Sequence, residues 1–200
     1  MTKRQNDPSH DYAHASNVLH NCQLIVQHEG GDMEILFPAA LFHDVVIYPK
    51  NHPQSPQAPE ESAVLIEAIL NEEGTYPKDK IAQVCQCIRS CSFSKQEVPQ
   101  TPEVAILRDA DRLAATGAIA IMRTFASSGQ MSRALYNIED PFAVSRETDP
   151  RCFGLDLFYQ RLLIAKDRMY TKTAKAVAEQ RTEFLKLFLD QLKNELSDTI

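Results

Sequence analysis

The stretch at residues 36–46 reads LFPAALFHDVV, an apolar run that ends in an adjacent histidine and aspartate, His43 and Asp44. Apolar residues at positions 36, 37, 40 and 41 recur at helical spacing, which predicts a core helix with the pair at its C-terminal end. Pro38 would either open or kink that helix. A buried charge costs several kcal/mol unless it has a partner, and a bound metal ion is one common partner. By itself, the pair also suits a histidine at the negative end of a helix dipole beside a solvated aspartate.

Length, charge and cysteine content limit the number of domains, the partners and the compartment to be expected for this chain. The chain has 200 residues and a formal net charge of -6, so we expect a single domain over residues 1–200 with a full core. The negative charge argues against long nucleic acid or an anionic membrane as a partner. No stretch reaches the roughly 18 apolar residues of a membrane span and the start lacks a signal-peptide core, so we expect a cytoplasmic protein. Five scattered cysteines without a Cys-x-x-Cys motif favour free thiols.

Helix signals recur along the chain, and no alternating pattern demands a strand. Capping residues, prolines and glycines predict helices over residues 9–29, 59–74, 77–90, 101–115, 118–126, 155–170 and 173–196. Four prolines between residues 47 and 59 are typical of a functional loop. We expect a core over about 10–130, an irregular segment over about 127–150 and C-terminal helices over about 151–197. The last helix should bury an apolar face made of Phe184, Leu185, Phe188, Leu189, Leu192 and Leu196.

Two further regions offer candidate metal ligands. His10 and His14 lie four residues apart on one face of a predicted helix, where they could bind a metal as a pair. A polar helix start with a surplus histidine is the ordinary alternative. Asp109 and Asp111 are two residues apart, hence about 200 degrees apart around a helix, so both cannot face one site. One of them should be a surface partner for a neighbouring arginine.

The candidate ligands, taken together with their spacing, resemble the signature of a known protein family. The spaced set of His14, His43-Asp44 and Asp111 resembles the H…HD…D signature of the HD superfamily of metal-dependent phosphohydrolases. Shorter matches, which include Glu61-Ser-Ala and Asp109-Ala-Asp-Arg-Leu, resemble a bacterial branch of small HD proteins over about residues 10–195. The resemblance implies an all-α HD-domain helical bundle with two additional C-terminal helices. It also implies that His14, His43, Asp44 and Asp111 bind one divalent metal ion (Mn, Fe, Ni, Co, Zn or Mg), with Asp109 as the surface residue.

The implied chemistry is hydrolytic attack on phosphorus. Asp44 would both ligate the metal and orient water. Glu61 is a candidate to position water or to carry a proton, and the alternative is a first-turn glutamate that only complements the helix dipole. Three residues could contact phosphate groups of the substrate: Lys50 and His52 on the proline loop, and Arg112 next to a ligand. Each of these three, taken singly, also suits a solvated surface position.

The branch that the chain resembles implies a nucleotide as substrate, and we favour removal of pyrophosphate from nucleoside or deoxynucleoside triphosphates. The alternative within the enzyme class is 5′-nucleotidase or phosphodiesterase activity. A non-catalytic HD module that senses a nucleotide or partner protein is the alternative outside it, and the last two helices could then form a homodimer. The branch usually has Arg, His and Asp where this chain has Asn17, Cys91 and Ala114. These changes mildly favour the sensor, whereas the retained ligand set favours the enzyme.

Overall fold

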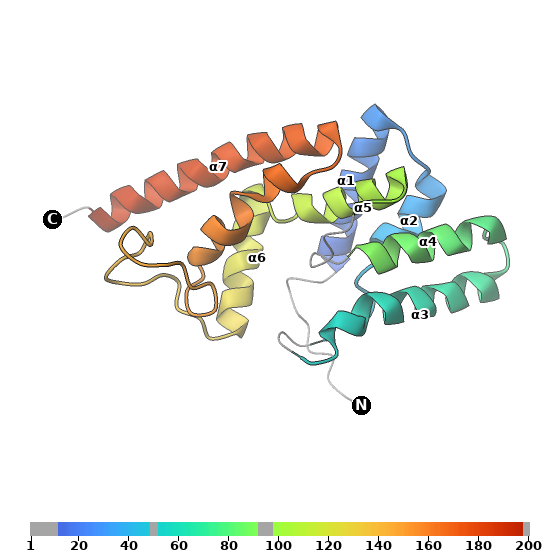
Figure 1. The fold of residues 1–200 in the computed structure, drawn as a ribbon, viewed down its shortest axis with the longest axis horizontal. Coiled ribbons are helices and arrows are strands. Elements are labelled where there is room, and N and C mark those ends of the chain that lie inside the picture. The colour runs from blue at the N-terminus through green and yellow to red at the C-terminus, as the bar shows by residue number, and fades with distance from the viewer. Residues whose placement is uncertain (1–11, 49–51, 92–97, 198–200) are drawn as a thin grey trace. The chain divides into compact units, whose positions relative to one another are not determined.

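The computed structural model describes residues 12–48, 52–91 and 98–197. These residues form seven α-helices and no strand, which confirms the expected all-α class (Figure 1). Two compact units are present, one within residues 10–112 and the other within residues 113–200. The single domain expected over residues 1–200 stays a prediction. None of the described helices is long and apolar enough to cross a lipid bilayer.

The first unit contains five helices, and its core is built around the apolar run identified in the sequence. The helices are α1 (Tyr12–Glu29), α2 (Met33–Phe42), α3 (Ala58–Glu73), α4 (Lys78–Ser90) and α5 (Pro102–Leu113). Helix α2 begins after Asp32, whose carboxylate accepts the N–H of Glu34 at 2.9 Å, and it continues through Pro38. Because α1 and α4 both pack on α2, the run buries Leu36, Ala39 and Ala40. Phe37 was expected in the core but is 51% exposed.

Helix α5 is largely buried and is bonded to α1. The Nδ2 amide of Asn21, on α1, donates to the carbonyl of Ala110 at 3.0 Å and joins the two helices. Most of α5 is buried, including Asp109, which has no exposed surface. The expectation that Asp109 is a surface residue is therefore wrong. Its carboxylate lies 3.7 Å from Nη1 of Arg112, so the pairing with a neighbouring arginine is present but buried.

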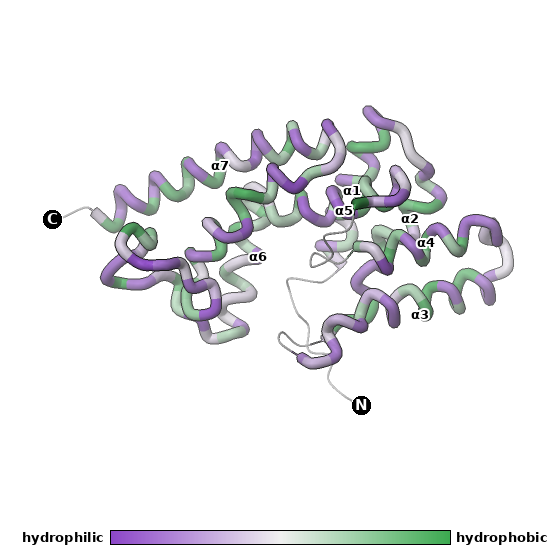
Figure 2. Tube along the Cα trace, in the orientation of Figure 1, coloured by the Kyte–Doolittle hydropathy of each residue, from purple (hydrophilic) through white to green (hydrophobic). Residues whose placement is uncertain are grey.

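The second unit packs α6 (Gly117–Gln130) against α7 (Lys172–Ser197). Hydrophilic and hydrophobic bands alternate along α7, as an amphipathic helix requires (Figure 2). Phe158 is fully buried and stacks on Phe188 of α7 with ring centroids 5.6 Å apart. Its buried neighbours are Ala120, Leu155, Leu162 and Leu185. Phe184 and Leu196, which were expected on the same buried face, are exposed.

The helix predicted over residues 155–170 is replaced by two short turns. A π-helical turn spans Phe158–Leu162 and a 3-10 turn spans Ala165–Arg168. In the first turn, the N–H of Leu163 donates to the carbonyl of Phe158 at 2.9 Å. This bond connects residues five apart, as in a π-helix, instead of the four apart of an α-helix. The apolar spacing of this stretch suits a regular helix, whereas the backbone bonds change where Phe158 lies buried in the core.

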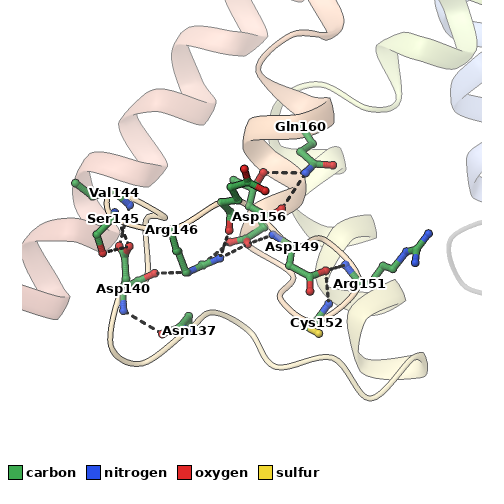
Figure 3. A network of polar contacts seen from close by, with 12 residues as sticks. Asn137, Asp140, Val144, Ser145, Arg146, Asp149, Arg151, Cys152, Asp156 and Gln160 are labelled. Atoms are coloured by element: carbon green, nitrogen blue, oxygen red, sulfur yellow. Dashed lines mark hydrogen bonds and ion pairs between the residues drawn. The ribbon is translucent and has the colours of Figure 1, made fainter.

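A network of polar contacts holds the irregular segment between α6 and Phe158 (Figure 3). Asp156 is fully buried, and its carboxylate accepts two bonds from the guanidinium of Arg146, at 2.6 and 2.9 Å. The N–H of Asp149 donates to the same carboxylate at 2.6 Å. The guanidinium also lies over the ring of Phe153, 4.8 Å from its centroid. Segments without regular backbone bonds are therefore joined through one buried carboxylate.

We expect Asp156→Ala to lower the free energy of unfolding by about 3 kcal/mol, because it removes the buried carboxylate that accepts from Arg146 and from the part-buried N–H of Asp149. The measurement is chemical unfolding followed by circular dichroism. Asp190→Ala, at an exposed position on α7, is the matched control and should change stability by less than about 0.5 kcal/mol. Equal stability of the two variants would show that the network does not hold the segment.

Candidate metal centre

Three candidate ligands from distant parts of the sequence meet in the first unit. His14 lies on α1, His43 directly follows α2, and Asp111 lies on α5. Each offers one ligand atom, and these atoms all lie within 4.8 Å of one another. Nε2 of His14 lies 3.4 Å from Oδ1 of Asp111. We call these three residues the ligand group. They are close enough together for one metal ion to bind all three.

The environment of His43 fits a metal ligand. Its Nδ1 lies 2.8 Å from the carbonyl oxygen of Ala40, and since a carbonyl can only accept, the proton is on Nδ1. Nε2 then carries the free lone pair that a metal requires. His43 is only 4% exposed, and Nε2 has no hydrogen-bond partner among the residues that the structure describes. A buried nitrogen without a partner is costly, and a cation in the ligand group would satisfy it.

Asp44 adds a second carboxylate to this environment. Its Oδ2 lies 3.4 Å from Nε2 of His43 and 3.8 Å from Nε2 of His14. The Asp44 side chain is 35% exposed, so solvent reaches it more readily than the two imidazoles. Two imidazoles with two carboxylates suit Mn, Fe, Co, Ni or Zn better than Ca. The role of Asp44 as a fourth ligand stays a prediction.

The predicted catalytic residue Glu61 lies in the first turn of α3 and is held by the loop that follows Asp44. Its Oε2 accepts a hydrogen bond from the hydroxyl of Tyr48 at 2.6 Å. Next to it, Oγ of Ser62 accepts the N–H of Val46 at 3.1 Å. These two bonds attach the start of α3 to the residues directly after the His-Asp pair. Tyr48 was missed in the sequence, where its only signal is its position four residues after Asp44.

The predicted phosphate contacts have different surroundings. His52 is partly exposed, and its ring stacks on that of Tyr48. Arg112 is buried and lies beside Asp109, whose carboxylate balances part of its positive charge inside the protein. Lys50 lies outside the described residues, as does His10, the other candidate ligand on the first predicted helix. The assignment of Lys50, His52 and Arg112 to substrate binding stays a prediction.

Of the three positions that depart from the resembled pattern, Cys91 and Ala114 are buried and Asn17 is partly buried. Asn17 lies one turn after His14 on α1, and its buried Nδ2 has no hydrogen-bond partner among the described residues. Cys91 is buried, and this burial raises the pKa of its thiol well above the ordinary value, with the nearby carboxylates of Asp111 and Asp44 adding to the shift. The thiol is therefore protonated at neutral pH. The third position, Ala114, is buried.

Comparison with models of known protein families identifies the family of this chain. The family model of the HD domain matches residues 11–116, more than half of the sequence, and the chain therefore belongs to the HD-domain family. The matched region contains the whole ligand group. HD domains bind divalent metals, which agrees with the chemistry of these donors.

Relatives and solved structures support the same assignment. YpgQ of Bacillus subtilis, described as an uncharacterized protein, is 28% identical over 193 residues, covering 94% of this chain and 84% of YpgQ. The crystal structure of YpgQ in complex with ADP matches with a TM-score of 0.73 at 28% identity, covering 94% of this chain and 91% of the other. An HD-superfamily hydrolase from Bacillus thuringiensis matches with a TM-score of 0.70 at 29% identity, covering 95% and 88%. The fold is that of an HD-superfamily hydrolase.

We expect the double variant His43→Ala, Asp44→Ala to lose metal binding while it keeps its helical content, because it removes one donor of the ligand group and the adjacent carboxylate. The measurement is calorimetric titration with Mn²⁺ or Co²⁺, alongside far-UV circular dichroism. His20→Ala, an exposed histidine on α1, is the matched control and should bind metal normally. Full metal occupancy in the double variant would overturn the site.

Proposed function

We propose that the chain is a divalent-metal-dependent phosphohydrolase that acts on a nucleotide, with removal of pyrophosphate from a nucleoside or deoxynucleoside triphosphate as the favoured reaction. The observation that carries the proposal is the ligand group, a buried set of two imidazoles and a carboxylate within 4.8 Å of one another. A purely structural role for these residues would leave the buried Nε2 of His43 unsatisfied.

The proposed roles follow from the surroundings of each residue. His14, His43, Asp44 and Asp111 would hold the metal, and Asp44, which solvent reaches, would also orient water. When bound, a divalent metal supplies a Lewis acid that polarises the phosphoryl oxygen and lowers the pKa of water. The bond from His43 Nδ1 to Ala40 holds the imidazole in the tautomer that can ligate.

Glu61 would position water or carry a proton during the reaction. The hydroxyl of Tyr48 takes one acceptor site on Oε2, and the carboxylate keeps further acceptor sites for a water molecule. Lys50 and His52 would contact the phosphates from the proline loop. Arg112 is a further candidate for contacting the phosphates, although the carboxylate of Asp109 already balances part of its positive charge.

The choice of a nucleotide rests on the relatives. YpgQ has been crystallised with ADP, and it covers nearly the whole chain at 28% identity. A bound nucleotide suits either a substrate or a sensed ligand. The retained donors, together with a carboxylate that solvent can reach, favour hydrolysis over sensing, since a sensor has no need of a metal that admits water and a phosphate oxygen together.

The test is a hydrolysis assay on nucleoside mono-, di- and triphosphates with Mn²⁺, Co²⁺, Ni²⁺ or Mg²⁺, in which inorganic phosphate and pyrophosphate are measured separately. We expect pyrophosphate from triphosphates, and no product in EDTA. Phosphate from monophosphates instead would support the 5′-nucleotidase. An absence of turnover with every metal, in protein shown to hold one, would replace the enzyme with a binding module.

Asp111→Asn should lower turnover by at least about 100-fold, because the substitution removes the charge of one proposed ligand while it keeps the size of the side chain. Asp79→Asn, in the exposed first turn of α4, is the matched control. It should leave the rate unchanged. Comparable rates for the two variants would remove Asp111 from the site.

A further inference from the structure

Tyr48 contacts two residues that the proposed reaction needs. Its hydroxyl lies 2.6 Å from Oε2 of Glu61, the proposed water-handling carboxylate. Its ring lies parallel to the imidazole of His52, with centroids 5.0 Å apart and an angle of 9° between the planes. One side chain therefore contacts a carboxylate through its polar end and an imidazole through its face.

The contact with Glu61 has a defined direction. An ionised carboxylate can only accept, so the tyrosine hydroxyl donates. The hydrogen bond to Glu61, desolvation and the negative charge of Glu61 raise the pKa of Tyr48 above its ordinary value, so the hydroxyl is protonated at neutral pH. A bond from a hydroxyl to a charged oxygen is stronger than one between neutral groups. It therefore limits the orientations of the Glu61 side chain.

The surroundings of His52 also define its donor atom. The N–H of Gln54 donates to Nδ1 of His52 at 3.2 Å, so in the neutral imidazole the proton is on Nε2. The stacked ring of Tyr48 fixes the plane in which this Nε2–H points. A donor of fixed direction suits an anionic oxygen such as that of a phosphate group.

We propose that Tyr48 is a positioning residue of the hydrolysis: its hydroxyl orients Glu61 for water, and its ring orients His52 for a phosphate oxygen of the substrate. This inference rests on the proposed function and deepens it. The loop that carries Tyr48 is bonded to α3 near its start, because the N–H of Val46, two residues after Asp44, donates to Oγ of Ser62. A shift of Tyr48 would thus disturb both groups while the ligand group stays in place.

Two substitutions separate the two contacts. Tyr48→Phe keeps the ring and removes the hydroxyl, so we expect kcat to fall roughly 10-fold with little change in KM. Tyr48→Leu also removes the stacking and should raise KM several-fold in addition. Tyr76→Phe is the matched control, since the hydroxyl of Tyr76 donates to the backbone carbonyl of Glu34 at 2.8 Å. It should leave both constants unchanged.

A double-mutant cycle tests whether Tyr48 acts through Glu61. If it does, Tyr48→Phe has no further effect on kcat in a Glu61→Ala background, because the hydroxyl then has no carboxylate to orient. A tyrosine that only stabilises the fold would give losses that multiply. Multiplying losses in an active enzyme would overturn the inference and leave the proposed function intact.

A second readout is independent of activity. Spectrophotometric titration of the tyrosines should show one phenol that ionises at lower pH in Glu61→Ala than in the unmodified protein, and Tyr48→Phe should remove that group. An unchanged titration in Glu61→Ala would overturn the contact itself. An absence of turnover in the unmodified protein, with the expected titration, would instead reject the proposed function and with it the catalytic role of Tyr48.

Discussion

The hydrogen bond from His43 Nδ1 to the carbonyl of Ala40 is the interaction on which the candidate site depends. It gives His43, the first residue after α2, a free lone pair on Nε2 with which to ligate a metal, inside a core that water reaches poorly. Without it, the imidazole could take either tautomer. The helix thus contributes to the site twice: it buries its apolar face, and its last turn orients the ligand.

The same principle operates around Glu61 and Asp156. In each case a carboxylate is held by donors from an irregular segment, namely Tyr48 in the first unit and Arg146 in the second. Irregular backbone lacks regular internal bonds, so such side chains define its path. The difference lies in burial, because Asp156 has all its surface covered whereas Glu61 is partly exposed at the start of α3. A partly exposed carboxylate remains available to a substrate.

Most helices of the described residues could be predicted from local signals. Prolines, caps and glycines mark the ends of α3, α4 and α5 within a few residues, because these residue types act on the backbone nearby. The stretch at 155–170 shows where this reasoning fails. Its apolar spacing is helical, yet the chain makes a π-helical and a 3-10 turn as Phe158 enters the core. Packing between distant segments overrides local spacing there.

The sequence alone determined the helical class and the residue types of the site, because ligand chemistry and helix signals are properties of local sequence. Only the tertiary structure decided which groups meet. It brought the ligand atoms of His14, His43 and Asp111 within 4.8 Å of one another, buried Asp109 where a surface was expected, and placed the hydroxyl of Tyr48 against Glu61. Burial and contact depend on which elements pack around a residue, and helical spacing within one segment does not contain that information.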